Sequence, residues 1–231
     1  MIADRVAAVR ERIARAAERA SRPPDDITLV AVSKTFPAEA VRAAFAAGVR
    51  HFGENRVQEA SAKIDALADL RSRGLKWHLI GHLQSNKGRK AASLFDVVQS
   101  VDSVALAERL ARAAKESGRA RRVLVQVDLA GETTKSGLPE AELNEALRRM
   151  GGLDGLQVTG LMVLPPYLGP EEVRPYFRRL RVLRDEAVRE GLLDGSDLSM
   201  GMSHDFEAAV EEGATIVRVG TAIFGARTVA A

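Results

Sequence analysis

Lys34 is the residue of this sequence best placed to do covalent chemistry. It follows the apolar, β-branched run 27–33, and counting back by twos reaches Val32 and Val30. In a strand these alternate positions share one face, so the Lys34 amine would project from the carboxyl end of a buried face, with Pro37 at the start of a helix. Burial and a helix N-terminus both lower a lysine pKa, and a neutral amine adds to aldehydes. On position alone, a lysine that reaches solvent is the commoner case.

A second group of candidate residues lies near the end of the sequence. Ser203 and the pair Gly220-Thr221 stand where the last two predicted helices begin. Backbone amides at a helix start, with a glycine and nearby hydroxyls, can bind an anion such as phosphate. The same residue types also serve as simple N-caps, so the local chemistry leaves both interpretations open.

Arg218 lies on the same predicted strand face as Ile216 and Gly220. A guanidinium among apolar neighbours is costly unless it is paired. At the end of a strand it could donate to a ring nitrogen or a carboxylate of a ligand. The structural alternative is an ion pair with Glu54 or Asp128.

The pattern that must position these residues is an alternation of strands and helices. A helix over residues 2–20 precedes eight predicted strands, at 27–33, 49–53, 76–81, 97–101, 122–129, 156–164, 198–201 and 215–219. The predicted intervening helices are 37–47, 55–70, 84–94, 103–117, 139–150, 170–190 and a last one that starts at Ser203 or Asp205 and ends at Glu212. This alternation predicts a parallel sheet, and eight repeats predict a single (β/α)8 TIM-type barrel domain over residues 1–231. A doubly wound open sheet is less favoured because no G-x-G-x-x-G turn follows the first strand.

Composition excludes several functional classes. The 231 residues contain no cysteine, which rules out disulfides and thiolate metal sites. Basic residues exceed acidic ones by 34 to 31, but no basic run is interleaved with aromatics, so no nucleic-acid partner is expected. The four histidines lack metal-ligand spacing, and no metal is expected. The charged N-terminus and the lack of a long apolar segment predict a cytoplasmic protein without membrane contact.

Seven motifs together resemble a known family. They are VAVSKT, HFGENRVQE, WHLIGHLQSNK, VQSVDS, GETTKSG, LSMGMSHDFEAAV and RVGTAIFGAR, in this order over residues 27–227. The sequence resembles the pyridoxal phosphate homeostasis protein family, also called the proline synthase co-transcribed family. The resemblance implies an α/β barrel similar to the N-terminal domain of alanine racemase, in which Lys34 holds pyridoxal 5'-phosphate (PLP) as a Schiff base, an internal aldimine.

The same resemblance assigns the other cofactor contacts. It implies that Ser203, Gly220 and Thr221 bind the phosphate, that Arg218 faces the pyridine nitrogen, and that Asn55 contacts the ring hydroxyl. An arginine opposite the pyridine nitrogen disfavours its protonation, which makes the ring a weaker electron sink.

Some positions depart from the family pattern. Phe36 stands where a lysine is common, so a second-lysine role is lost there, and Asp128 replaces a usual asparagine, which leaves contacts from the fifth strand in doubt. His204 occupies a variable position. Lys135, in a predicted loop at the same end of the barrel, is a candidate for a second, weaker aldehyde-capturing residue.

The expected function is that of a non-catalytic PLP carrier. Enzymes like alanine racemase add a second domain that supplies a catalytic tyrosine, whereas the tyrosines here are Tyr167 and Tyr176, both after the sixth strand. We therefore expect no catalytic residues and a monomer that acts in intracellular PLP homeostasis, delivering PLP to dependent apo-enzymes. The open alternatives are a small PLP-dependent racemase or aldolase, or a barrel aldolase that acts on a phosphorylated substrate without a bound chromophore.

Overall fold

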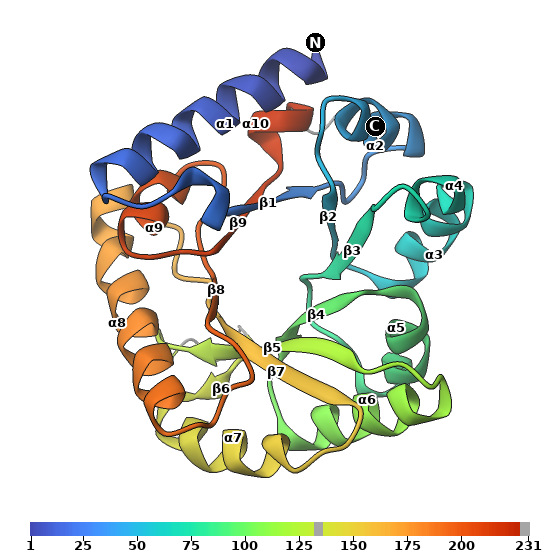
Figure 1. The fold of residues 1–231 in the computed structure, drawn as a ribbon, viewed down its shortest axis with the longest axis vertical. Coiled ribbons are helices and arrows are strands. Elements are labelled where there is room, and N and C mark those ends of the chain that lie inside the picture. The colour runs from blue at the N-terminus through green and yellow to red at the C-terminus, as the bar shows by residue number, and fades with distance from the viewer. Residues whose placement is uncertain (132–135, 227–231) are drawn as a thin grey trace.

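The chain forms a closed parallel β/α barrel (Figure 1). The computed structural model describes residues 1–131 and 136–226, and within these ranges eight parallel strands close into the barrel. In order around it they are β1 (Thr28–Val32), β2 (His51–Glu54), β3 (Lys76–Leu79), β4 (Val97–Val101), β5 (Arg121–Asp128), β7 (Leu156–Met162), β8 (Asp197–Ser199) and β9 (Ile216–Val219). Pairing of β4 with β5 and of β9 with β1 completes the ring. The predicted fold class is confirmed.

Helices surround the barrel and enclose most of its core. They are α1 (Ile2–Arg19), α2 (Ala38–Ala46), α3 (Val57–Ala66), α4 (Ala68–Arg71), α5 (Gly88–Leu94), α6 (Val104–Glu116), α7 (Leu143–Gly151), α8 (Pro170–Arg189), α9 (Phe206–Glu211) and α10 (Thr221–Phe224). Three short 3-10 turns, Pro24–Asp26, Ser85–Lys87 and Glu140–Glu142, and the two-residue strand β6 (Leu138–Pro139), which pairs with β5, lie in the connections.

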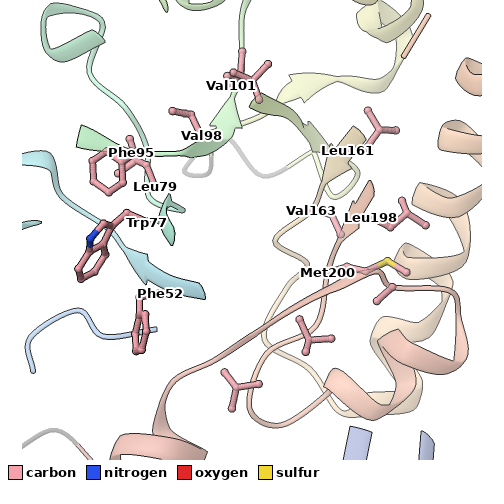
Figure 2. Packing of buried hydrophobic residues seen from close by; sticks show 14 of the residues in the cluster. Phe52, Trp77, Leu79, Phe95, Val98, Val101, Leu161, Val163, Leu198 and Met200 are labelled. Carbon is pink, nitrogen blue, oxygen red and sulfur yellow. The ribbon is translucent and has the colours of Figure 1, made fainter. Parts of the chain in front are cut away.

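The apolar core has two parts. The larger cluster lies between the strands and the helices, and Figure 2 shows part of it, including Phe52 and Trp77 from neighbouring strands with ring centroids 5.9 Å apart. The smaller cluster, made of Val30, Val97, Leu124, Met162 and Ile216, comes from five different strands. Strands buried on both faces have nearly continuous apolar sequences, which explains the Val- and Leu-rich runs.

The N-terminal helix α1 packs on the outside of the barrel, against helices that follow its first strand and its last two strands. Its buried face, Val6, Val9 and Ile13, recurs at helical spacing and lies against α9, α10 and α2 (Figure 1). The expected extra helix is thus confirmed, and it covers the elements that follow β8 and β9.

One helix prediction needs correction. The predicted helix over 55–70 is two helices, because Leu67 leaves helical geometry (φ −117°, ψ 20°) while its side chain is fully buried. Of the two starts predicted for the helix that ends near Glu212, Asp205 is confirmed as the N-cap, and the helix begins at Phe206. The other bounds differ from the prediction mainly at helix and strand ends.

In the described part of the chain, we find no helix with the length and apolar character required to span a membrane.

Candidate functional site

A cavity of about 550 Å³ lies at the carboxyl ends of β1, β8 and β9. Its lining residues are Val32, Lys34, Phe36, Tyr167, Met202, Ser203, His204, Arg218, Gly220 and Thr221. The structure thus brings together five of the six predicted cofactor-binding residues. The volume lies in the range of roughly 300–1,000 Å³ that is usual for small-molecule sites.

Lys34 reaches this cavity from a strained turn. The turn follows β1 and is closed by the Phe36 N–H, which donates to the Ser33 carbonyl oxygen (3.1 Å). Thr35 has φ +67°, a left-handed conformation that is costly for a β-branched residue. The Lys34 side chain is half-buried. Such strain persists only where surrounding contacts hold the backbone in place.

Lys63 and Glu54 supply those contacts. The Lys63 ammonium on α3 donates to the Ser33 carbonyl oxygen (2.8 Å) and to Oε1 of Glu54 on β2 (2.6 Å). The Ser33 hydroxyl donates to the same Oε1 (2.6 Å), and the Glu54 side chain is fully buried. We call Ser33, Glu54 and Lys63 the turn clamp. Sequence reasoning missed Lys63, although a glutamate at the end of a buried strand already signals a need for a cationic partner.

Ser203 joins the loop after β8 to the loop after β9. Its Oγ accepts the Gly220 N–H (3.1 Å) and the Ala222 N–H (3.5 Å), at the start of α10. It does not cap α9, where Asp205 is the N-cap residue and accepts the Met202 N–H (2.5 Å). The interpretation of Ser203 as a cap of its own helix is therefore wrong. The hydroxyl and the amides at the start of α10 meet beside the cavity, and such groups suit an anion.

Gly201 permits the tight path of the loop after β8. Its φ is +89°, and a Cβ there would lie 2.6 Å from Cβ of Ala209 and 2.9 Å from Cα of Phe206. A side chain at residue 201 would push this loop away from α9, and Ser203 with it.

Arg218 is buried at the base of the cavity, with 2% of its surface exposed. Its Nη1 donates to the Ser199 hydroxyl (2.5 Å) and its Nη2 to the Val163 carbonyl oxygen (2.8 Å). Burial lowers its pKa to about 10, and the charge of Asp205 partly opposes this shift. The guanidinium is therefore still charged at neutral pH. Two of its five N–H groups are used by these bonds, so others are available to a ligand.

The alternative ion pairs of Arg218 are wrong for the described residues. Glu54 pairs with Lys63, and Oδ1 of Asp128 accepts the N–H groups of Ala130 and Gly131 (3.0 Å each). Neither carboxylate contacts the guanidinium. Asp128 instead shapes the turn at the end of β5, as an asparagine could also do.

Three further residues form the outer wall of the cavity. The Phe36 ring stacks on Phe224 (centroids 5.0 Å apart), which gives this position an apolar role in place of a lysine. Tyr167 is 82% exposed, and the centroid of its ring lies 4.6 Å from that of His204. Nε2 of His204 lies 3.3 Å from Oδ2 of the buried Asp205. Tyr167 and His204 thus line the cavity together, and Tyr167 is its most exposed large apolar residue.

Asn55 lies outside this cavity. It lines a separate one of about 500 Å³, together with Arg56, His82 and Lys87. A Cβ at Gly81 would overlap the Asn55 backbone, so the glycine fixes the close approach of the loops after β2 and β3. The proposed contact of Asn55 with a ring hydroxyl stays a prediction, and Lys135 lies outside the described residues.

A line of polar side chains inside the barrel was also missed by sequence reasoning. His51, His78, Gln99 and Ser199 lead from β2 through β3, β4 and β8 to Arg218 on β9. All but His51 are buried, although most of these short strands also contain another polar residue. A polar residue in a buried strand is the only signal the sequence offers. Among the described residues, no three or more His, Asp or Glu side chains are grouped as metal ligands.

The fold and the cavity together define a β/α barrel of the alanine racemase N-terminal type. Residues 5–228 match the family "Alanine racemase, N-terminal domain". Curated relatives carry the name "Pyridoxal phosphate homeostasis protein". That of Aquifex aeolicus is 46% identical over 97% of both chains, and that of Escherichia coli K12 is 44% identical over 98% of this chain and 97% of its own. The structure of PipY from Synechococcus elongatus PCC7942 with PLP bound superposes with a TM-score of 0.86, at 46% identity over 97% of this chain and all of that one. The chain belongs to the pyridoxal phosphate homeostasis protein family.

Proposed function

We propose that this protein binds PLP in the cavity at Lys34 and acts in intracellular PLP homeostasis, as a single-domain monomer without strong catalysis of its own. One observation carries the proposal: an amine, a buried guanidinium and a hydroxyl–amide pair line the same cavity of about 550 Å³. These groups match the three ends of the cofactor. The relatives' names and the PLP-bound PipY structure support it.

Each of these groups would contact a different part of PLP. The amides of Gly220 and Thr221 and the Ser203 hydroxyl would hold the phosphate, and Arg218 would donate to the pyridine nitrogen. When bound, PLP supplies an aldehyde that reacts with amines. The Lys34 nitrogen would form a double bond to the aldehyde carbon, and the aldehyde oxygen would leave as water. Phe36 and Phe224 would exclude water from one side.

Arg218 supports a carrier over a catalyst. A charged guanidinium next to the pyridine nitrogen opposes a second positive charge on that nitrogen. A positive charge on the pyridine nitrogen stabilises carbanions next to the ring. Without it, the protein would hold the cofactor rather than catalyse reactions with it. PLP-dependent apo-enzymes would then be the recipients.

A spectral titration tests the proposal. Full-length protein with added PLP is expected to show an absorbance band distinct from that of free PLP, and reduction with borohydride should fix one label on Lys34. Lys34→Ala should lose both signals, whereas the exposed control Lys115→Ala should keep them. A Lys34→Ala protein with the full band and label would refute the assignment.

The racemase or aldolase alternative has one feature in its favour, because Tyr167 and His204 line the same cavity. It predicts exchange of the α-proton of an amino acid in deuterated buffer, with loss of exchange in Tyr167→Phe and His204→Gln. A lack of exchange across the common amino acids would leave the carrier function.

A further inference from the structure

Five polar side chains from five strands form a continuous hydrogen-bonded chain through the barrel interior. Nδ1 of His51 lies 2.9 Å from Nε2 of His78, and Nδ1 of His78 lies 2.8 Å from Nε2 of Gln99. The Ser199 hydroxyl lies 2.6 Å from Oε1 of Gln99 and 2.5 Å from Nη1 of Arg218. His78, Gln99, Ser199 and Arg218 are each at most 2% exposed. We call these five residues the polar chain.

The two ends of the polar chain open on different cavities. Arg218 lines the cavity at the carboxyl ends of the strands. His51 begins β2 and lines a cavity of about 510 Å³ with the first residues of β1 and part of α1. The polar chain therefore connects opposite faces of the barrel.

Donor and acceptor chemistry gives the polar chain one direction. A guanidinium can only donate, so Ser199 accepts from Arg218 and donates its hydroxyl hydrogen to Oε1 of Gln99. The Gln99 amide then donates to Nδ1 of His78, which must carry its hydrogen on Nε2 and donate to Nδ1 of His51. Every donor points away from Arg218. In a dry interior, bonds aligned in this way polarise one another.

Both histidines in the polar chain are neutral near pH 7. Burial lowers the pKa of His78 to about 3, and burial also lowers the pKa of His51, helped by the charges of Arg122 and Lys76. A proton on either ring would force two donors to face each other and break the order. The neutral state and the single direction thus require each other.

We propose that Gln99 and His78 are positioning residues for Arg218, and that the polar chain transmits the occupancy of the Arg218 cavity to His51 on the opposite face of the barrel. The part that concerns a ligand rests on the proposed function, since PLP would accept a hydrogen bond from Arg218. Such a bond changes the charge at the first donor, and each aligned bond passes the change to the next.

The tautomers can be measured without any ligand. The four histidines of the full-length protein are labelled with ¹⁵N, and their ring signals are assigned by single substitutions. His78 and His51 should both be neutral with the hydrogen on Nε2. Gln99→Met should shift the Nδ1 signal of His78, while the exposed His82, bonded to Asp102, keeps its signals. A hydrogen on Nδ1 of His78 in the unchanged protein would overturn the proposed direction.

Addition of PLP tests transmission. Saturation of the protein with PLP, followed by absorbance, should shift the ring signals of His78 and His51. In Gln99→Met the shift of the His51 signals should vanish, and the dissociation constant for PLP should rise about tenfold. Ser199→Ala should act like Gln99→Met, and Ser199→Thr, which keeps the hydroxyl, should restore the response. Unchanged His51 signals at full PLP occupancy would overturn the inference.

Failure of PLP binding is a separate outcome. It would refute the proposed function, and Arg218→Leu would then perturb the same end of the polar chain. That substitution should shift the His51 signals if the chain transmits, and a lack of any shift would refute transmission by itself.

Discussion

The Lys63 ammonium lies 2.8 Å from the carbonyl oxygen of Ser33, the residue directly before Lys34. The same ammonium neutralises the buried Glu54 carboxylate. A lysine on α3, 30 residues after Ser33, therefore holds the backbone from which the proposed nucleophile projects. The turn clamp ties the position of Lys34 to the packing of α3.

Lys63→Met should destabilise the protein by about 3–5 kcal/mol, because it leaves the Glu54 carboxylate buried without its cationic partner. Urea unfolding measures this change. The control Lys115→Met breaks an exposed pair with Asp154 and should leave the unfolding midpoint nearly unchanged. The double variant Lys63→Met, Glu54→Gln should regain most of the stability while PLP still attaches to Lys34 more slowly than in the unchanged protein. Equal losses in the single and double variants would contradict this account.

Thr35→Gly should raise the free energy of unfolding by up to about 1 kcal/mol, because glycine adopts a positive φ without the cost borne by a β-branched side chain. Ser21, at φ +52° after α1, is the matched control. Ser21→Gly should have a similar effect on thermal unfolding, but only Thr35→Gly should alter the rate of PLP attachment. A large loss of stability in Thr35→Gly would mean that its side chain is needed in the turn.

Ser203→Ala should raise the dissociation constant for PLP about tenfold, since one hydrogen bond to a charged phosphate is lost. Pyridoxal, which has no phosphate, should bind the variant and the unchanged protein equally well. Fluorescence or absorbance titration with the two compounds measures the difference. Ser93→Ala, in which the lost hydroxyl donated only to the Lys90 carbonyl oxygen, is the control. An equal effect on both compounds would remove the phosphate role of Ser203.

Stability should fall as the pH drops below about 6.5, because the pKa of His78 is about 3 in the folded protein and near 6.5 when unfolded. The unfolded state then binds more protons, so the free energy of unfolding decreases toward acid, with a limit of about 1.4 kcal/mol per pH unit for one histidine. The full contribution is present above pH 6.5 and is lost progressively down to pH 3. The free energy of unfolding, measured with urea at several pH values between 7 and 5, should change less steeply with pH for His78→Gln than for the unchanged protein. Parallel slopes would contradict a buried neutral His78.

Sequence reasoning reached the barrel because short strand-like segments alternate with helix-like ones along the whole chain, and it placed Lys34 because alternation along β1 puts Val30 and Val32 on its face. Single-strand patterns carry this information. They do not carry the register between strands, so the contacts of Arg218 with Ser199 and of His51 with His78 were out of reach. The choice between an N-cap and an anion-binding role for Ser203 stayed open for the same reason, since its hydroxyl bonds to a loop 17 residues away.

The pairing of β1 with β9 sets Val30 beside Arg218. Lys34 and Arg218 are therefore far apart in the chain and become neighbours only when the first and last strands of the barrel meet. A growing chain on the ribosome has made Lys34 long before β9, which carries Arg218 on the opposite wall of the cavity. At the proposed site, capture of the ligand would thus be a property of the finished barrel.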